Sequence, residues 1–233
     1  MSTSSGLDLA ARYAKRPALS GAFAPLTLLL YVAVAATVAL FAADALVQRR
    51  VGTLTQIALG QESPDPTAVV ASVRVGTQLS VAAYVSLVGA GLITMIWLFL
   101  ACRSDRTPEF SWRTAWIFLS WVTPVFNYVV PYLLFSQAHA SSQRRLGRFR
   151  AQTLGIFGAL WWGTWVGLLL VTSGAALRGG QSFDPGTTTY YLQALSISHR
   201  RLLQDGFAAV SGLCFLVVIA KLSRSVRTPT PAD

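Results

Sequence analysis

The sequence has little charge for its length. Only 12% of its 233 residues are charged, compared with about a quarter in an ordinary soluble domain, whereas 53% are hydrophobic. A surface with so few charges cannot face water on all sides, which excludes a soluble globular protein and predicts membrane spans. The length allows one domain of several helices but no large soluble enzyme beside them.

Cysteine and histidine are also scarce. Cys102 and Cys214 both fall in apolar runs, which excludes a disulfide framework. His139 and His199 have no second His or Cys at helical spacing, so no metal site is expected. The sequence contains no nucleophile elbow, phosphate loop or dinucleotide fingerprint. We therefore expect no catalytic residue, no metal, no cofactor and no enzymatic activity.

Basic residues outnumber acidic ones, and they are almost all arginine. Nineteen Lys and Arg residues, of which two are Lys, give a net charge of +10. These residues gather in short clusters between apolar runs, and no nucleic-acid-binding motif accompanies them. We expect the clusters to face anionic lipid, with the bilayer as the partner and no nucleic acid.

The charge-free runs predict where the chain crosses the membrane, because about 20 helical residues cross a hydrocarbon core ~30 Å thick. Asp-Pro turns before Thr67 and Thr187 predict that two helices begin as stalks outside the membrane. The predicted order is a cytoplasmic tail (1–18), a span (19–47), an outer loop (48–74), a span (75–102), a broken segment (114–138), a span (151–177), an outer loop with a helical stalk (178–205), a last span (206–222) and a cytoplasmic tail (223–233).

The segment 114–138 contains WVTPVFNYVVPY, in which two prolines flank an asparagine. Pro124 and Pro131 each remove an amide donor and disfavour helix at the residue before them, so neither part of the segment crosses alone. We interpret Asn127 as satisfying backbone groups that the prolines expose. A ligand contact at a helix break, as transporters use, is the alternative.

Loop charge distinguishes two topologies. If the segment 114–138 crosses the membrane, nine basic residues lie inside and ten outside; if it does not cross, thirteen lie inside and six outside. The second distribution agrees with the positive-inside rule. The sequence thus predicts an all-α integral membrane protein with four transmembrane helices, a Pro-broken re-entrant or interfacial segment and cytoplasmic termini. A five-span bundle is the alternative.

Small residues recur on one face of the fourth apolar run, and they predict close helix packing, either within the bundle or with a protein partner or second copy. These are Gly155, Ala159, Gly163 and Gly167. Charges are missing from the middle of every predicted span. Asp44 ends the first span and Asp205 begins the last, so we expect both to anchor at the interface, with an Asp44–Arg178 ion pair as the alternative.

Three groups of residues carry a family resemblance: Trp97-Leu98 with Arg103, Pro124-x-x-Asn127-x-x-x-Pro131-Tyr132, and Trp161-Trp162-x-x-Trp165. Over about residues 75–220 the chain resembles the bacterial membrane family named domain of unknown function 4328. The resemblance implies a small polytopic protein without established activity, and the arginine-rich composition resembles actinobacterial members. Leu100 and Ser104 stand where the family often has arginine and asparagine. By themselves, the three tryptophans favour an interfacial belt or lipid-facing positions over a ligand stack.

The function we expect is a non-enzymatic accessory or scaffold component of the cell envelope. The alternative is a small-solute or lipid transporter or channel that uses the helix break at Asn127. The residues expected to form the structural motif, or to contact a ligand, are Trp97, Arg103, Pro124, Asn127, Pro131 and Tyr132.

Reporter fusions test the predicted topology. A fusion after Gln143 should report a cytoplasmic position and a fusion after Gly186 an outer one, because only this pairing puts most basic residues inside. Paired alkaline phosphatase and fluorescent-protein reporters measure both positions. The reverse pattern contradicts the four-span topology.

Overall fold

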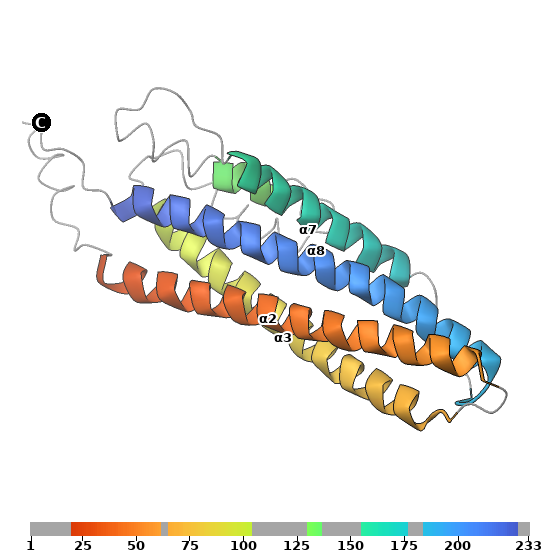
Figure 1. The fold of residues 1–233 in the computed structure, drawn as a ribbon. Coiled ribbons are helices and arrows are strands. Elements are labelled where there is room, and N and C mark those ends of the chain that lie inside the picture. Colours follow the sequence, from red (N-terminus) through yellow and green to blue (C-terminus); the bar gives the residue numbers. More distant parts are fainter. Residues whose placement is uncertain (1–19, 62–64, 104–129, 137–154, 177–183, 228–233) are drawn as a thin grey trace, which may run out of the picture.

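A computed structural model of the chain describes residues 20–61, 65–103, 130–136, 155–176 and 184–227. Four long helices make up most of it (Figure 1): α2 (Ser20–Leu59), α3 (Thr67–Arg103), α7 (Gly155–Ala176) and α8 (Thr188–Arg227). A short helix covers residues 130–136. This part of the chain contains no strand, and its four long helices are all apolar enough to span a membrane. The predicted all-α membrane fold is confirmed.

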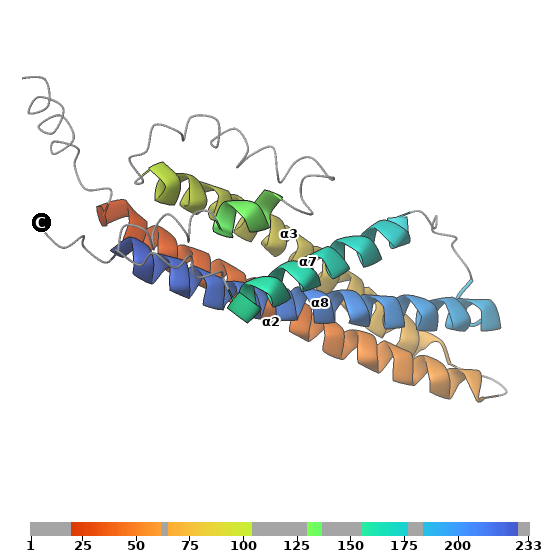
Figure 2. The same ribbon diagram turned by 90° about the horizontal axis from the view of Figure 1, so that it is seen from above.

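The helices alternate in direction. α2 and α7 run one way along the bundle, and α3 and α8 run the other way (Figures 1 and 2). α3 therefore ends, and α7 begins, toward the same end of the bundle. That arrangement agrees with four crossings and an intervening segment that does not cross. α2 packs along both α3 and α8, and α7 packs on α8.

Three helices, α2, α3 and α8, are longer than a membrane requires. α2 and α8 have 40 residues each and so extend about 60 Å, against a hydrocarbon core of ~30 Å. Within the outer segment predicted over 48–74, the helix from Thr67 was expected, whereas residues 48–59 are helical where a loop was expected. α2 continues to Leu59 because one face of its extension buries Val51, Thr55 and Ala58.

The two predicted helix starts are confirmed. Asp65 Oδ1 accepts hydrogen bonds from the Thr67 hydroxyl (2.6 Å) and amide (2.9 Å), which cap α3 and hold the pKa of Asp65 below its ordinary value. Thr187 caps α8, since its hydroxyl accepts a hydrogen bond from the Tyr190 amide at 3.1 Å. Gly186, with φ of +94°, makes the turn before it.

The two ends of the bundle have separate buried clusters. We call the end where α2 stops and α3 and α8 begin the stalk. Ala58, Val69 and Tyr191 form the core of the three-helix stalk. The largest cluster lies toward the opposite end, where the short helix places Phe135 edge-on against Trp161 (5.2 Å between centroids). Trp161 is 4% exposed because aromatic neighbours on the short helix and α8 cover it, so it does not face lipid, which was one of the two positions expected for it.

Many large apolar side chains point out of the bundle. A lipid environment accounts for this distribution, since hydrocarbon imposes no penalty on exposed Leu or Val. They occur on all four long helices and include Leu28, Val32, Val81, Val85, Ile156, Leu170 and Leu213. The helices are therefore suited to contact with a bilayer.

Gly212 sets the distance between α8 and α2. A Cβ atom at this position would overlap the Val38 side chain, which is β-branched and so has little rotamer freedom in a helix. We predict that Gly212→Ala destabilises the protein by about 1–3 kcal/mol. Thermal unfolding in detergent measures the effect.

Gly206→Ala on the same helix is the matched control, because nothing lies within 4 Å of the added Cβ. It should leave stability unchanged or raise it by up to about 1 kcal/mol. Equal unfolding temperatures for the two variants would show that Gly212 does not determine the helix approach.

Candidate functional site

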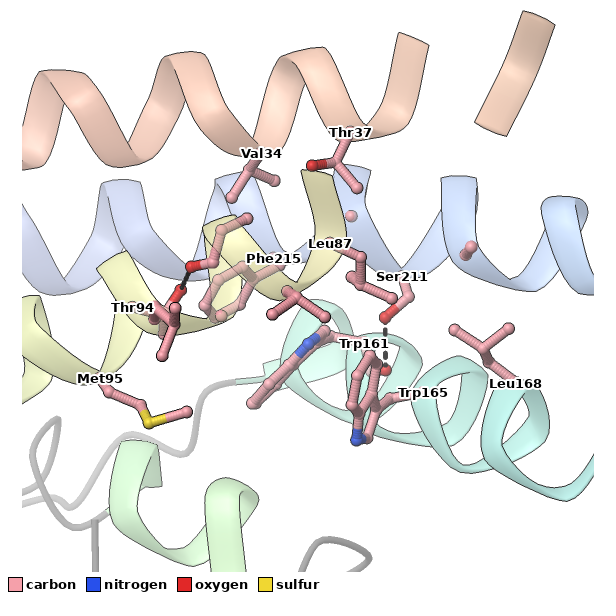
Figure 3. A pocket seen from close by; sticks show the side chains of 16 residues that line it. Val34, Thr37, Leu87, Thr94, Met95, Trp161, Trp165, Leu168, Ser211 and Phe215 are labelled. Atoms are coloured by element: carbon pink, nitrogen blue, oxygen red, sulfur yellow. Dashed lines mark hydrogen bonds between the residues drawn. The ribbon is translucent and has the colours of Figure 1, made fainter. Parts of the chain in front are cut away.

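A cavity of about 270 Å³ lies between α3 and α7, with α2 and α8 behind it (Figure 3). It exists because α7 packs on α8 and not closely on α3. Its walls are mostly apolar side chains from all four long helices, among them Val34, Leu87, Met95, Trp161, Leu168 and Phe215.

Three hydroxyl groups also line the cavity, but each already has a backbone acceptor. The hydrogen bonds run from Thr37 to the carbonyl of Ala33 (2.8 Å), from Thr94 to that of Ala90 (2.7 Å) and from Ser211 to that of Trp161 (3.4 Å). The last of these is drawn in Figure 3. A hydroxyl has one proton to donate, so these groups offer no donor to a ligand. Apart from these hydroxyls and the indole N–H groups of Trp161 and Trp165, the cavity wall is apolar.

Toward the stalk, polar side chains from the four long helices gather beyond the cavity. We call them the polar cluster: Asp44 and Gln48 from α2, Ser80 and Tyr84 from α3, Thr172 from α7, and Arg201, Gln204 and Asp205 from α8. Phe41 and Ala83, both fully buried, lie next to it on the cavity side.

Asp44 is the most fully hydrogen-bonded member of the cluster. It is 1% exposed; Gln48 Nε2 donates to its Oδ1 at 2.9 Å, and the Ser80 hydroxyl donates to its Oδ2. Arg201 Nη1 in turn donates to Ser80 Oγ at 3.4 Å. Gly76 makes room for this arrangement, because a Cβ there would lie 2.7 Å from Gln48 Nε2.

Asp205, unlike Asp44, has a carboxylate oxygen that accepts no hydrogen bond. It is 2% exposed, and its Oδ2 has no hydrogen-bond partner. Its charge interacts with those of Asp44 and Arg201. The neighbouring Gln204 Nε2 donates to Thr172 Oγ1 at 3.5 Å, which joins α8 to α7 at this level.

Sequence reasoning missed this cluster. Asp44 and Asp205 were expected to anchor at the interface, and each does stand at the end of an apolar run, but both point into the bundle. The four-residue spacings from Asp44 to Gln48 and from Arg201 to Asp205, each one helical turn, were the available signal. Arg178, the alternative partner of Asp44, lies outside the described residues.

The residues expected to form the motif or contact a ligand are described only in part. Trp97 is buried; its Nε1 donates to Thr27 Oγ1 at 3.0 Å, which links α3 to α2. Pro131 is buried in the first turn of the short helix, and the Tyr132 ring lies 5.8 Å from that of Trp162. Arg103 ends α3, while Pro124 and Asn127 lie outside the described residues.

Only part of the small-residue face of α7 lies against another helix. Cβ atoms added at Gly155 and Gly167 would meet α8 side chains, at 3.6 Å from Lys221 Nζ and 3.1 Å from Phe207 respectively. Gly163 has open space around it, and Ala159 is exposed. Helix packing through the whole face stays a prediction.

The family model described as Domain of unknown function (DUF4328) matches residues 60–224. The chain belongs to this family. The DUF4328 match covers α3, the short helix, α7 and α8 and leaves α2 outside it. Both the cavity and the polar cluster therefore combine DUF4328 residues with side chains of α2. No curated protein and no solved structure matches the chain.

Removing the Ser80 hydroxyl tests the cluster's structural role. Ser80→Ala leaves Asp44 Oδ2 buried without its donor and should destabilise the protein by about 1–3 kcal/mol. Thr77→Ala, on an exposed face of α3 one turn earlier, should stay within about 0.5 kcal/mol of the parent. Thermal unfolding in detergent compares them, and equal values would refute the importance of the Asp44–Ser80 bond.

Proposed function

We propose that this protein is a non-enzymatic membrane protein that holds an acyl chain of a membrane lipid in the cavity between α3 and α7. The observation that carries the proposal is the apolar wall with its three occupied hydroxyls. A polar ligand there would lose its hydrogen bonds to water and find no free hydroxyl donor in return. A hydrocarbon chain makes no hydrogen bonds to water, so it loses none when it enters the cavity.

The size and access of the cavity support the same ligand. An apolar cavity of about 150 Å³ is enough to bind benzene, so 270 Å³ accommodates a longer stretch of hydrocarbon. Val88 and Leu92 line the cavity and are also 64% and 54% exposed on the outside of α3. A lipid tail can thus enter sideways from the bilayer without crossing a polar region.

The accessory or scaffold role expected from the sequence belongs to this proposal, since holding a lipid requires shape and apolar contact and no reacting group. In the proposed orientation the protein is a multi-pass cell-membrane protein with both termini in the cytoplasm. The basic clusters around 144–150 and 221–227 then contact anionic headgroups of the inner leaflet. The transporter alternative depends on Asn127, which the described residues do not include.

Filling the cavity tests the proposal. Ala90 lines the cavity, so Ala90→Leu should reduce lipid binding about 5- to 150-fold, because steric overlap typically costs about 1–3 kcal/mol. Lipid retained after purification from native membranes in mild detergent is extracted and quantified by mass spectrometry.

Ala82→Leu is the matched control: the same substitution on the same helix, at an exposed position that does not line the cavity. It should retain lipid like the parent protein. Equal lipid content in both variants, with both folded by circular dichroism, would rule out the cavity as the binding site.

A further inference from the structure

The polar cluster has an unbalanced charge. Asp44 and Asp205 each carry a negative charge when ionised, and Arg201 supplies one positive charge, which leaves a net charge of minus one. Both carboxylates are almost completely buried, and Arg201 is half-buried. A net charge inside a bundle, next to the fully buried Phe41 and Ala83, is costly unless something compensates it.

The side chains present do not provide that compensation. Arg201 donates to Ser80, and no ion pair joins it to Asp44 or Asp205 within the described part of the chain. Asp44 uses both oxygens as hydrogen-bond acceptors, whereas Asp205 Oδ2 is buried without a donor. The unpartnered oxygen therefore belongs to the same cluster that carries the uncompensated negative charge.

We propose that the polar cluster binds one sodium ion between Asp205 and Asp44. Carboxylate oxygens are hard ligands of the kind that alkali and alkaline-earth cations prefer. Asp44 keeps spare lone pairs after accepting one hydrogen bond at each oxygen, and Asp205 Oδ2 has all of its own. A single positive charge neutralises the cluster, whereas a divalent ion would leave an excess positive charge.

The position of the cluster is suited to an ion that arrives from water. Asp44 and Asp205 lie at the ends of the charge-free runs nearest the stalk, so an ion reaches them without crossing the apolar middle of the bundle. The cluster also joins α2, α3 and α8, and Gln204 extends it to α7. Sodium binding should consequently stabilise the whole bundle. This inference does not depend on lipid binding in the cavity.

Thermal unfolding of the purified full-length protein tests the site. Sodium chloride is titrated against choline chloride at constant ionic strength and fixed pH. The parent protein should show a saturable rise of Tm, roughly 3–6 °C at ten times the Kd. Isothermal titration calorimetry with sodium chloride should show one saturable site; failure to detect one, together with a flat Tm, overturns the proposal.

Asp205→Asn is the decisive variant. It removes the unpartnered charge, so it should unfold at a higher temperature than the parent in choline and should lose the response to sodium. Asp184→Asn, the same change at an exposed position before α8, should keep that response. If Asp205→Asn fails to fold, calorimetry with sodium chloride on the parent protein decides whether the site binds sodium.

Two further outcomes contradict the sodium site. A larger rise of Tm with potassium than with sodium would overturn the choice of ion. A Tm that ignores sodium but rises as the pH falls, in the parent and not in Asp205→Asn, would show that a proton neutralises the cluster. The titratable neighbours in that case are Asp44 on α2, Tyr84 on α3 and Arg201 on α8.

Discussion

Three side-chain hydrogen bonds fix α2 against α3 in one antiparallel register. Trp97 donates to Thr27, Thr37 bonds Ser86, and Ser80 donates to Asp44, so residues advancing along α2 meet residues receding along α3. Lipid tails give helices no hydrophobic reason to associate, so polar bonds and close contacts decide how they pair. The rest of the bundle is placed relative to this pair: α8 packs on α2 at Gly212, and α7 packs on α8.

The cavity follows from that order of packing. α2 has neighbours on two sides, but α7 reaches the bundle through α8, with Phe207 against Gly167 and Gln204 bonded to Thr172. α7 and α3 are therefore not closely packed on each other, and the cavity lies between them. Tryptophan side chains narrow the space between them without closing it, since Trp161 turns to stack on Phe215 at 5.0 Å.

Local sequence signals determined the parts of the fold that depend on one helix alone. Charge-free runs identified the four spans, and Asp-Pro turns identified the starts at Thr67 and Thr187. The missed features depend on a second helix. α2 continues to Leu59 because α3 and α8 cover it, and whether Asp44 points to lipid headgroups or into the bundle is decided by Ser80, 36 residues away. The position of a residue at the end of an apolar run predicts its depth in the membrane, but it does not predict which side of the helix its side chain faces.

The cavity and the polar cluster are next to each other, and α7 bounds both. Leu168 lines the cavity, and Thr172, one turn later on α7, hydrogen-bonds Gln204 in the cluster. Phe41 and Ala83 fill the layer between them and come from the α2–α3 pair, whose register is fixed by the three hydrogen bonds. A displacement of α7 along or away from α8 would therefore change the cavity and the Gln204–Thr172 bond together. The two sites thus share one wall formed by α7 and another formed by the α2–α3 pair.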